Sequence, residues 1–182
     1  ELQEKYQEDF QILKGLYLNT EYLGFKVDNP QSILTDKRIR QALNYGFDRA
    51  KMVAYLRNNM GTPAVNGFIP EGLQGRYLSG YDYDLTKAKK LVEEYKSETK
   101  NNNLSVTLST NASYLDIAEY LQREWQKTGI QIKIDVQPNS ALRQGMATGK
   151  VDFFRGSWIA DYPDSENYFS LFYSKNFAPN GP

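Results

Sequence analysis

The amino-acid sequence predicts an α/β fold, a lobe built on a mixed sheet with a βαβ unit flanked by helices. Apolar and polar residues alternate over 104–108 and again over 130–136, the pattern of strands. Between these stretches apolar residues recur every three or four positions, the period of a helix. Strand, helix and strand at this spacing favour two parallel strands joined by a right-handed crossover.

Size and composition limit the function classes. The chain has 182 residues and 21.0 kDa, the size of one domain or of one lobe of a larger protein. Its 22 basic and 22 acidic residues balance, so no overall field attracts nucleic acid, and we expect no nucleic-acid partner. The chain has no His and no Cys, which excludes a Ser-His-Asp triad, a thiolate nucleophile and His- or Cys-ligated metal. Carboxylate pairs, Lys, Tyr and Ser are what remains for catalysis, so an enzyme is disfavoured, and we expect no catalytic residues, no cofactor and no metal site.

The hydropathy gives no sign of a membrane span, and the chain ends indicate a piece of a longer protein. No stretch reaches the roughly 18 to 20 apolar residues of a membrane span. The sequence opens at Glu1 without an initiator Met and closes on loop-like Asn180, Gly181 and Pro182. We therefore expect segments on both sides of residues 1–182, and a missing signal segment says nothing about export.

The first half of the chain predicts one strand and one long helix. Residues 1–14 are compatible with a helix, and 16–27 mix aromatic and β-branched residues as strands do. A helix is expected over 36–58, capped by Thr35 or Asp36. Its apolar positions at three- and four-residue spacing are Ile39, Leu43, Phe47, Ala50 and Val53. Seven Gly and Pro residues within 60–80 then predict a long irregular loop.

The second half predicts alternating helices and strands. Asp84 is placed to cap a helix whose apolar face holds Ala88, Leu91, Val92 and Tyr95. The helix between the two alternating strands runs over 114–128 and ends at Gly129. A short helix over 141–148, an apolar strand over 151–158 and a last helix capped by Asp164 or Ser165 follow. No internal repeat or linker divides the chain, so residues 1–182 are expected to form a single α/β lobe.

The last expected strand ends in an unusual cluster: Arg155-Gly156-Ser157-Trp158-Ile159-Ala160-Asp161-Tyr162-Pro163-Asp164. Ligands of open α/β sheets gather at the carboxyl ends of strands, so a binding site is expected here. Asp161 suits a ligand ammonium, Tyr162 offers an aromatic face and Arg155 suits a ligand carboxylate. Gly156 allows close approach of a ligand backbone.

Simpler roles for the same residues stay open. Asp164 is most simply a helix cap, and Trp158 is more often a core residue than a ligand platform. Arg155 could form an ion pair with any internal acid.

A longer motif carries a family resemblance. The run Asp36-Lys37-Arg38-Ile39-Arg40-Gln41-Ala42-Leu43-Asn44-Tyr45-Gly46-Phe47-Asp48-Arg49 resembles extracytoplasmic solute-binding proteins of family 5, the oligopeptide- and dipeptide-binding proteins of ABC importers. Further pieces occur in the family's order: Tyr22-Leu23-Gly24-Phe25, Tyr83-Asp84 with Ala88-Lys89-Lys90-Leu91, Leu121-Gln122 with Gly129-Ile130, and Trp158 to Asp164. Lys26 stands where the family pattern has Asn.

The resemblance implies the C-terminal lobe of a class II, two-lobed binding protein, with the N-terminal lobe and a final return segment absent from this chain. It implies an extracytoplasmic protein, lipid-anchored or free, that captures peptides and delivers them to an ABC permease, and that is no enzyme. In peptide-binding members the equivalent of Asp161 pairs with the peptide α-amino group, and that of Trp158 lines a side-chain pocket. The equivalent of Arg155 meets a ligand carboxylate. The backbone of Gly156, Ser157, Trp158 and Ile159 would pair with an extended peptide.

Three alternatives remain at this stage. The family that this chain resembles also contains binders of nickel complexes, haem and oligosaccharides. A glycoside hydrolase would use Asp161 and Asp164 as a carboxylate dyad. A sensor lobe would have kept the fold and lost transport.

Overall fold

The computed structural model describes residues 5, 13, 15–73 and 80–179. The strands are β1 (Asn19–Phe25), β2 (Ser105–Thr110), β3 (Gln131–Val136) and β4 (Phe153–Ile159). The helices are α2 (Lys37–Tyr45), α3 (Arg49–Arg57), α4 (Leu85–Thr99), α5 (Leu115–Gln126), α6 (Asn139–Ala147) and α7 (Ser165–Phe169). Short 3-10 turns are η1 (Ile33–Thr35), η2 (Ala112–Tyr114), η3 (Ser170–Phe172) and η4 (Ser174–Asn176). The helix expected over 1–14 falls almost wholly outside the described residues.

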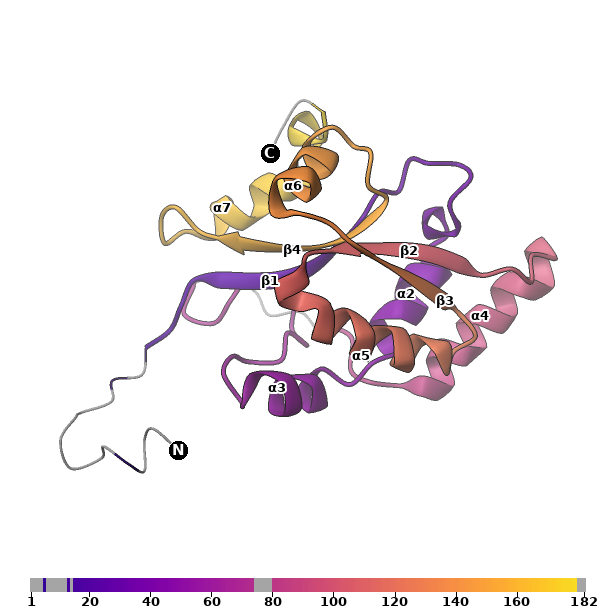
Figure 1. Ribbon diagram of the computed structural model, residues 1–182, viewed down its shortest axis with the longest axis horizontal. Coiled ribbons are helices and arrows are strands. Elements are labelled where there is room, and N and C mark those ends of the chain that lie inside the picture. The colour runs from indigo at the N-terminus through magenta and orange to yellow at the C-terminus, as the bar shows by residue number, and fades with distance from the viewer. Residues whose placement is uncertain (1–4, 6–12, 14, 74–79, 180–182) are drawn as a thin grey trace.

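The four strands form one mixed sheet in the order β1-β4-β2-β3 (Figure 1). β2 and β3 are parallel, with Val106 opposite Ile132, and α5 connects them. β4 runs parallel to β2, with Phe154 opposite Ser109, and β1 is antiparallel to β4. The predicted mixed sheet and its βαβ unit are confirmed.

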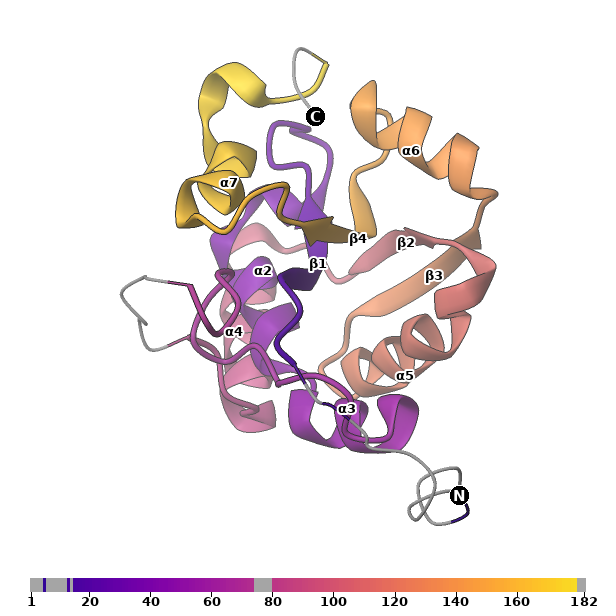
Figure 2. The same cartoon turned by 90° about the vertical axis from the view of Figure 1, so that its left-hand side faces the viewer.

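Helices cover both faces of the sheet. Figures 1 and 2 show α2, α4 and α5 on one face and α6 and α7 on the other. The main core lies between the sheet and the first group, where the fully buried side chains include Ile39, Leu43, Val92, Leu108, Leu121, Trp125 and Phe153. The Trp125 indole N–H donates to the Leu43 carbonyl at 2.8 Å, which ties α5 to α2 without leaving a buried donor unpaired.

The single helix predicted over 36–58 is wrong, because the structure has two helices there. α2 ends at Tyr45 with Gly46 as its C-cap, and the Asp48 side chain accepts from the Lys51 N–H to cap α3. Between them the Arg49 side chain turns back and donates to the carbonyl and side-chain oxygens of Asn44, at 2.9 and 3.0 Å. Phe47 packs edge-on against Trp125 in the core. The prediction failed because the three- and four-residue spacing of apolar residues continues from α2 into α3. The break between the two helices depends on the caps and contacts described here, which that spacing does not report.

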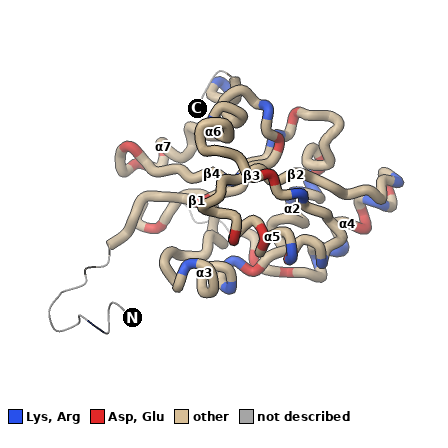
Figure 3. The backbone as a smooth tube through the Cα atoms, viewed as in Figure 1, with Lys and Arg blue, Asp and Glu red and all other residues tan. Residues whose placement is uncertain are grey.

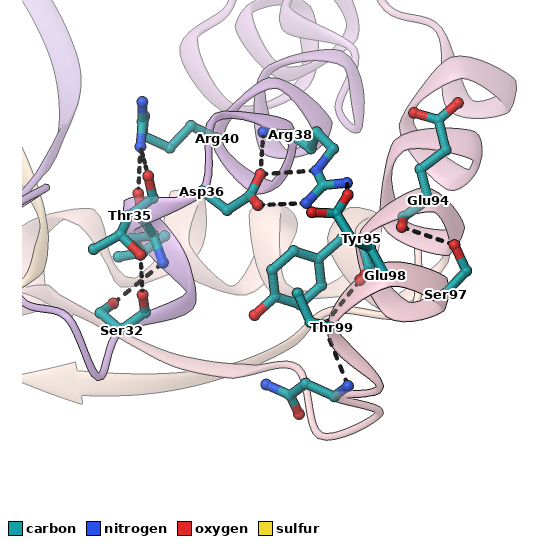
Figure 4. Close-up of polar contacts among 12 residues, drawn as sticks. Ser32, Thr35, Asp36, Arg38, Arg40, Glu94, Tyr95, Ser97, Glu98 and Thr99 are labelled. Carbon is teal, nitrogen blue, oxygen red and sulfur yellow. Dashed lines mark hydrogen bonds and ion pairs between the residues drawn. The ribbon is translucent and has the colours of Figure 1, made fainter.

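The motif at the start of α2 has scaffold contacts (Figure 4). Asp36 accepts from the Arg38 N–H at 2.8 Å and caps the helix. The Arg38 guanidinium pairs with Asp36 at 2.7 Å and with Glu98 of α4 at 2.5 Å. Arg40 donates to the carbonyls of Leu34 and Thr35. This part of the family motif therefore joins η1, α2 and α4 to one another.

Most other expectations for the elements hold. Asp84 and Asp164 cap α4 and α7, and Gly129 after α5 has a φ of 90°. Residues 60–73 form neither helix nor strand, as predicted for the loop, and 74–79 lie outside the described residues. In the described part of the chain no helix is long and apolar enough to cross a membrane.

Candidate functional site

Strand β4 has one fully paired edge and one partly open edge. β1 pairs along its whole length, from Phe153 to Ile159. On the other side, β2 faces β4 with a single aligned pair, at Phe154, and β2 ends at Thr110. In the described part of the chain no strand pairs with this side of β4 over 156–159.

The alternation of main-chain bonds shows which residues face the open edge. Bonds from Lys26 N–H to Asp152 and from Ala160 N–H to Leu18, of 2.8 and 3.0 Å, continue the ladder between β1 and β4 at both ends. Even-numbered residues of β4 thus point their main-chain groups toward β1, and odd-numbered ones point away. Ser157 and Ile159 therefore direct their N–H and C=O groups to the open edge, which is the geometry that accepts an added strand.

Trp158 is fixed against α7. Its indole N–H donates to Asn167 Oδ1 at 2.7 Å, and the Asn167 residue is only 5% exposed. The adjacent Tyr168 is fully buried, and its hydroxyl donates to the Leu18 carbonyl at 2.7 Å. These two bonds fasten α7 to the end of β4 and to the start of β1. Trp158 itself remains half-buried, so it is neither a fully buried core residue nor a fully exposed side chain.

The turn between β4 and α7 is exposed and acidic (Figure 3). Asp161 has no hydrogen-bond or ion-pair partner among the described residues, and its side chain faces solvent. Asp164 is occupied, because its carboxylate accepts from the Glu166 N–H at 2.7 Å and caps α7. The Tyr162 hydroxyl lies 3.5 Å from Glu166 Oε2, and the Tyr162 residue is 47% exposed.

Arg155 lies on the opposite face of the sheet from Trp158, because side chains alternate along a strand. Its guanidinium pairs with Glu21 of β1. Its Cζ lies 3.2 Å from the centroid of the Tyr114 ring, a cation–π contact. Burial lowers the pKa of Arg155 to about 10, so the group is still protonated at neutral pH. The open alternative that Arg155 pairs with an internal acid is thus what the structure shows.

Gly156 is required by a neighbour within the sheet. A Cβ added at this residue would lie 2.7 Å from Cζ of Tyr22, the residue opposite it on β1. The Tyr22 ring packs edge-on against Phe68 and Phe154, at centroid distances of 5.2 and 6.3 Å. The space beside Gly156 on this face therefore belongs to Tyr22.

The structure thus brings together some predicted site residues and separates another. Trp158, Ile159, Asp161 and Tyr162 share the corner where β4 leads into α7. Arg155 lies earlier in β4, with its side chain on the face opposite to that of Trp158. Exposed apolar side chains continue from this corner: Ile159, Tyr162, Phe169, Phe172 and Tyr173 are 47 to 60% exposed. Within the described residues, no group of three or more acidic side chains is placed to hold a metal ion.

Sequence reasoning missed three partners of the site. Glu21 lies in the expected strand over 16–27. Alternation along that strand could have predicted which face of the sheet Glu21 occupies, but not that it pairs with Arg155. Tyr114 begins the helix expected over 114–128, and its stacking on Arg155 depends on the fold. Nothing in the local sequence indicates that Asn167 accepts from Trp158.

Comparison with known proteins matches this chain to a family. The model of the bacterial extracellular solute-binding proteins, family 5 middle region, matches residues 1–180. The chain belongs to this family. The resemblance carried by the sequence motifs is thereby confirmed.

Individual family 5 proteins match over most of this chain. The dipeptide-binding protein of Escherichia coli strain K12 is 28% identical over 163 residues, which cover 86% of this chain and 30% of that protein. Heme-binding protein A of Haemophilus influenzae is 26% identical over 165 residues, 88% of this chain and 30% of its own. The solved structure of Burkholderia pseudomallei OppA superposes with a TM-score of 0.73 at 29% identity, covering 86% of this chain and 32% of that one. The chain thus spans about a third of the length of these family 5 proteins.

Proposed function

We propose that this chain is one lobe of an extracytoplasmic, two-lobed binding protein that captures peptides and delivers them to an ABC permease. The observation that carries the proposal is the open edge of β4 at Ser157 and Ile159, beside the unpartnered carboxylate of Asp161. An extended peptide has main-chain groups that can pair with the open edge of β4 and an α-ammonium that can pair with Asp161. Relatives named for dipeptide and oligopeptide binding support the same ligand class.

The peptide adds to β4 as a strand in this mechanism. Its N–H and C=O groups pair with those of Ser157 and Ile159, and its α-ammonium pairs with Asp161. Trp158 and Tyr162 line one side-chain pocket. A ligand carboxylate would meet Arg155, which lies on the other face of the sheet and is paired with Glu21. Main-chain pairing does not depend on side-chain identity, so affinity comes with broad sequence tolerance.

A second lobe completes this site. Asp161 is exposed in the present chain, and an exposed ion pair contributes little. When the other lobe closes over the peptide, the pair between Asp161 and the ammonium is removed from water and becomes stronger. The ligand then stabilises the closed form because it contacts both lobes, and the permease recognises that form. This chain alone should therefore bind peptide weakly.

The rival functions have less support. A dyad of Asp161 and Asp164 needs two available carboxyl groups, and Asp164 already accepts from the N-terminal turn of α7. Binding without catalysis is therefore the better assignment. Haem binding is kept as an outcome of the test because of the relative named for it, although this chain has no His or Cys to ligate iron.

The test is native mass spectrometry of the full-length protein as purified, for wild type, Asp161→Ala and the control Asp82→Ala. Asp82 is an exposed acid outside the β4 corner. Peptides of mixed mass on wild type and on the control, and none on Asp161→Ala, are the expected result. A sugar, haem, a metal complex or no ligand on all three proteins would overturn peptide capture.

A further inference from the structure

Glu21 is held in place by two partners on one face of the sheet. Its Oε1 accepts from the Asn19 amide at 2.8 Å, and its Oε2 pairs with Arg155. Glu21 lies opposite Ser157 and Arg155 opposite Leu23, so the two charged residues are diagonal neighbours across β1 and β4. A carboxylate with both oxygens engaged is a fixed counterion rather than a passing contact.

Arg155 is fixed from the other side as well. Its guanidinium stacks on Tyr114, and the Arg57 guanidinium lies 5.7 Å from the centroid of the same ring. Arg57 is in turn held by Asp116 through bonds of 2.7 and 3.2 Å. The Arg155 side chain is 11% exposed, which leaves it little freedom to leave Glu21 and follow a ligand.

The pair changes what the site can recognise. A ligand carboxylate that approaches Arg155 meets the Glu21 carboxylate at the same guanidinium, and like charges in a shared site oppose each other. The ligand must displace Glu21, whose side chain is 44% exposed, or accept the repulsion. Arg155 without Glu21 would select a free carboxylate strongly, because charge-assisted bonds to guanidinium are among the strongest in proteins.

We propose that Glu21 sets the ligand specificity of this site by serving as the internal counterion of Arg155. The site then takes C-terminally amidated or extended peptides as readily as free-acid peptides of the same length. This inference rests on the peptide-binding function proposed above. It attributes the lack of discrimination between free-acid and amidated peptides to one residue of β1, which no sequence motif singled out.

The experiment measures affinity of the full-length protein for alanine tri-, tetra- and pentapeptides, each as free acid and as C-terminal amide, by calorimetry. Wild type should bind both forms within about threefold. Glu21→Gln keeps the shape of the side chain and removes its charge, and should favour the free acid by about tenfold or more, since roughly 1.4 kcal/mol is tenfold. Glu93→Gln makes the same charge change on α4, where Glu93 forms an exposed pair with Lys96, and should behave as wild type.

The double variant Glu21→Gln, Arg155→Gln separates the mechanism from a general charge effect, and its free-acid preference should return to that of wild type. The inference would be overturned by a tenfold free-acid preference in wild type, by an unchanged ratio in Glu21→Gln, or by a new preference that survives loss of Arg155. Failure of every peptide to bind wild type would overturn the proposed function and this inference together. Melting curves of the variants confirm that the ratios come from folded protein.

Discussion

The indole N–H of Trp158 and the Oδ1 of Asn167 are joined by a 2.7 Å hydrogen bond between the end of β4 and α7. The turn that carries Asp161 and Tyr162 lies between these two residues in the chain. One part-buried bond thus closes the loop that carries the proposed ammonium-binding carboxylate.

Replacing Asn167 by Ala leaves the Trp158 donor without its partner. Loss of a buried partner costs about 1 to 3 kcal/mol, so Asn167→Ala should lower the free energy of unfolding by that amount. Peptide affinity should fall as well, because the turn is no longer closed. Urea unfolding followed by circular dichroism checks the first expectation and calorimetry the second. The exposed Asn102→Ala should change stability by less than about 0.5 kcal/mol, and an equal loss in both variants would contradict the role of this bond.

Gly156→Ala should destabilise the protein through Tyr22. The new Cβ would lie 2.7 Å from the Tyr22 ring, which Phe68 and Phe154 hold in place. Overpacking of this kind costs about 1 to 3 kcal/mol, measured as a loss in the free energy of unfolding. Gly15→Ala is the matched control, because nothing lies within 4 Å of a Cβ at that position. If Gly156→Ala were as stable as Gly15→Ala, Tyr22 would not be what requires the glycine.

Asp36 should make stability fall in acid. Hydrogen bonds from the Arg38 side chain lower the pKa of Asp36, against a smaller opposing effect of burial. A carboxylate with a lowered pKa stabilises the fold above its unfolded value of about 3.9, and this is lost as pH falls through the folded value. Asp36→Ala should therefore lose about 1 to 2 kcal/mol at pH 7. Its difference from wild type should narrow as pH falls below the unfolded value of about 3.9.

Unfolding free energies of the Asp36→Ala protein from pH 7 to pH 2 provide the measurement. Asp28→Ala is the control, since Asp28 forms an exposed pair with Lys26 at 3.5 Å and should shift stability little. A difference between Asp36→Ala and wild type that stays constant down to pH 2 would rule out the ion pair as its source.

Peptide affinity should fall in alkali with the charge of the ligand. A peptide α-ammonium has a pKa of about 8, so above that pH the charge that Asp161 pairs with is lost and affinity should drop about tenfold per pH unit. Asp161→Asn should flatten this dependence, as should N-acetylation of the peptide. Calorimetry from pH 6 to pH 10 checks both. A slope that persists in Asp161→Asn would place the ammonium elsewhere.

Much of the fold could be predicted because its signals are local. Alternation over 104–108 and 130–136 reports one wet and one dry face of a strand, and Asp84 and Gly129 mark helix ends by chemistry within one turn. The helix break at Gly46 escaped because the apolar period runs on through Phe47. α2 ends because the Arg49 side chain donates a hydrogen bond back to Asn44 and because Phe47 packs against Trp125, which is far away in the sequence.

For the site, the sequence by itself determined which chemistry is present: a carboxylate and a phenol just past a strand, and an indole and a guanidinium within it. Only the tertiary structure decided which of these groups are available. Asp161 is unpartnered among the described residues, Trp158 is bound by Asn167, and Arg155 is neutralised by Glu21. The physical reason is that availability depends on the partner, and each partner comes from another element that folding brings alongside β4.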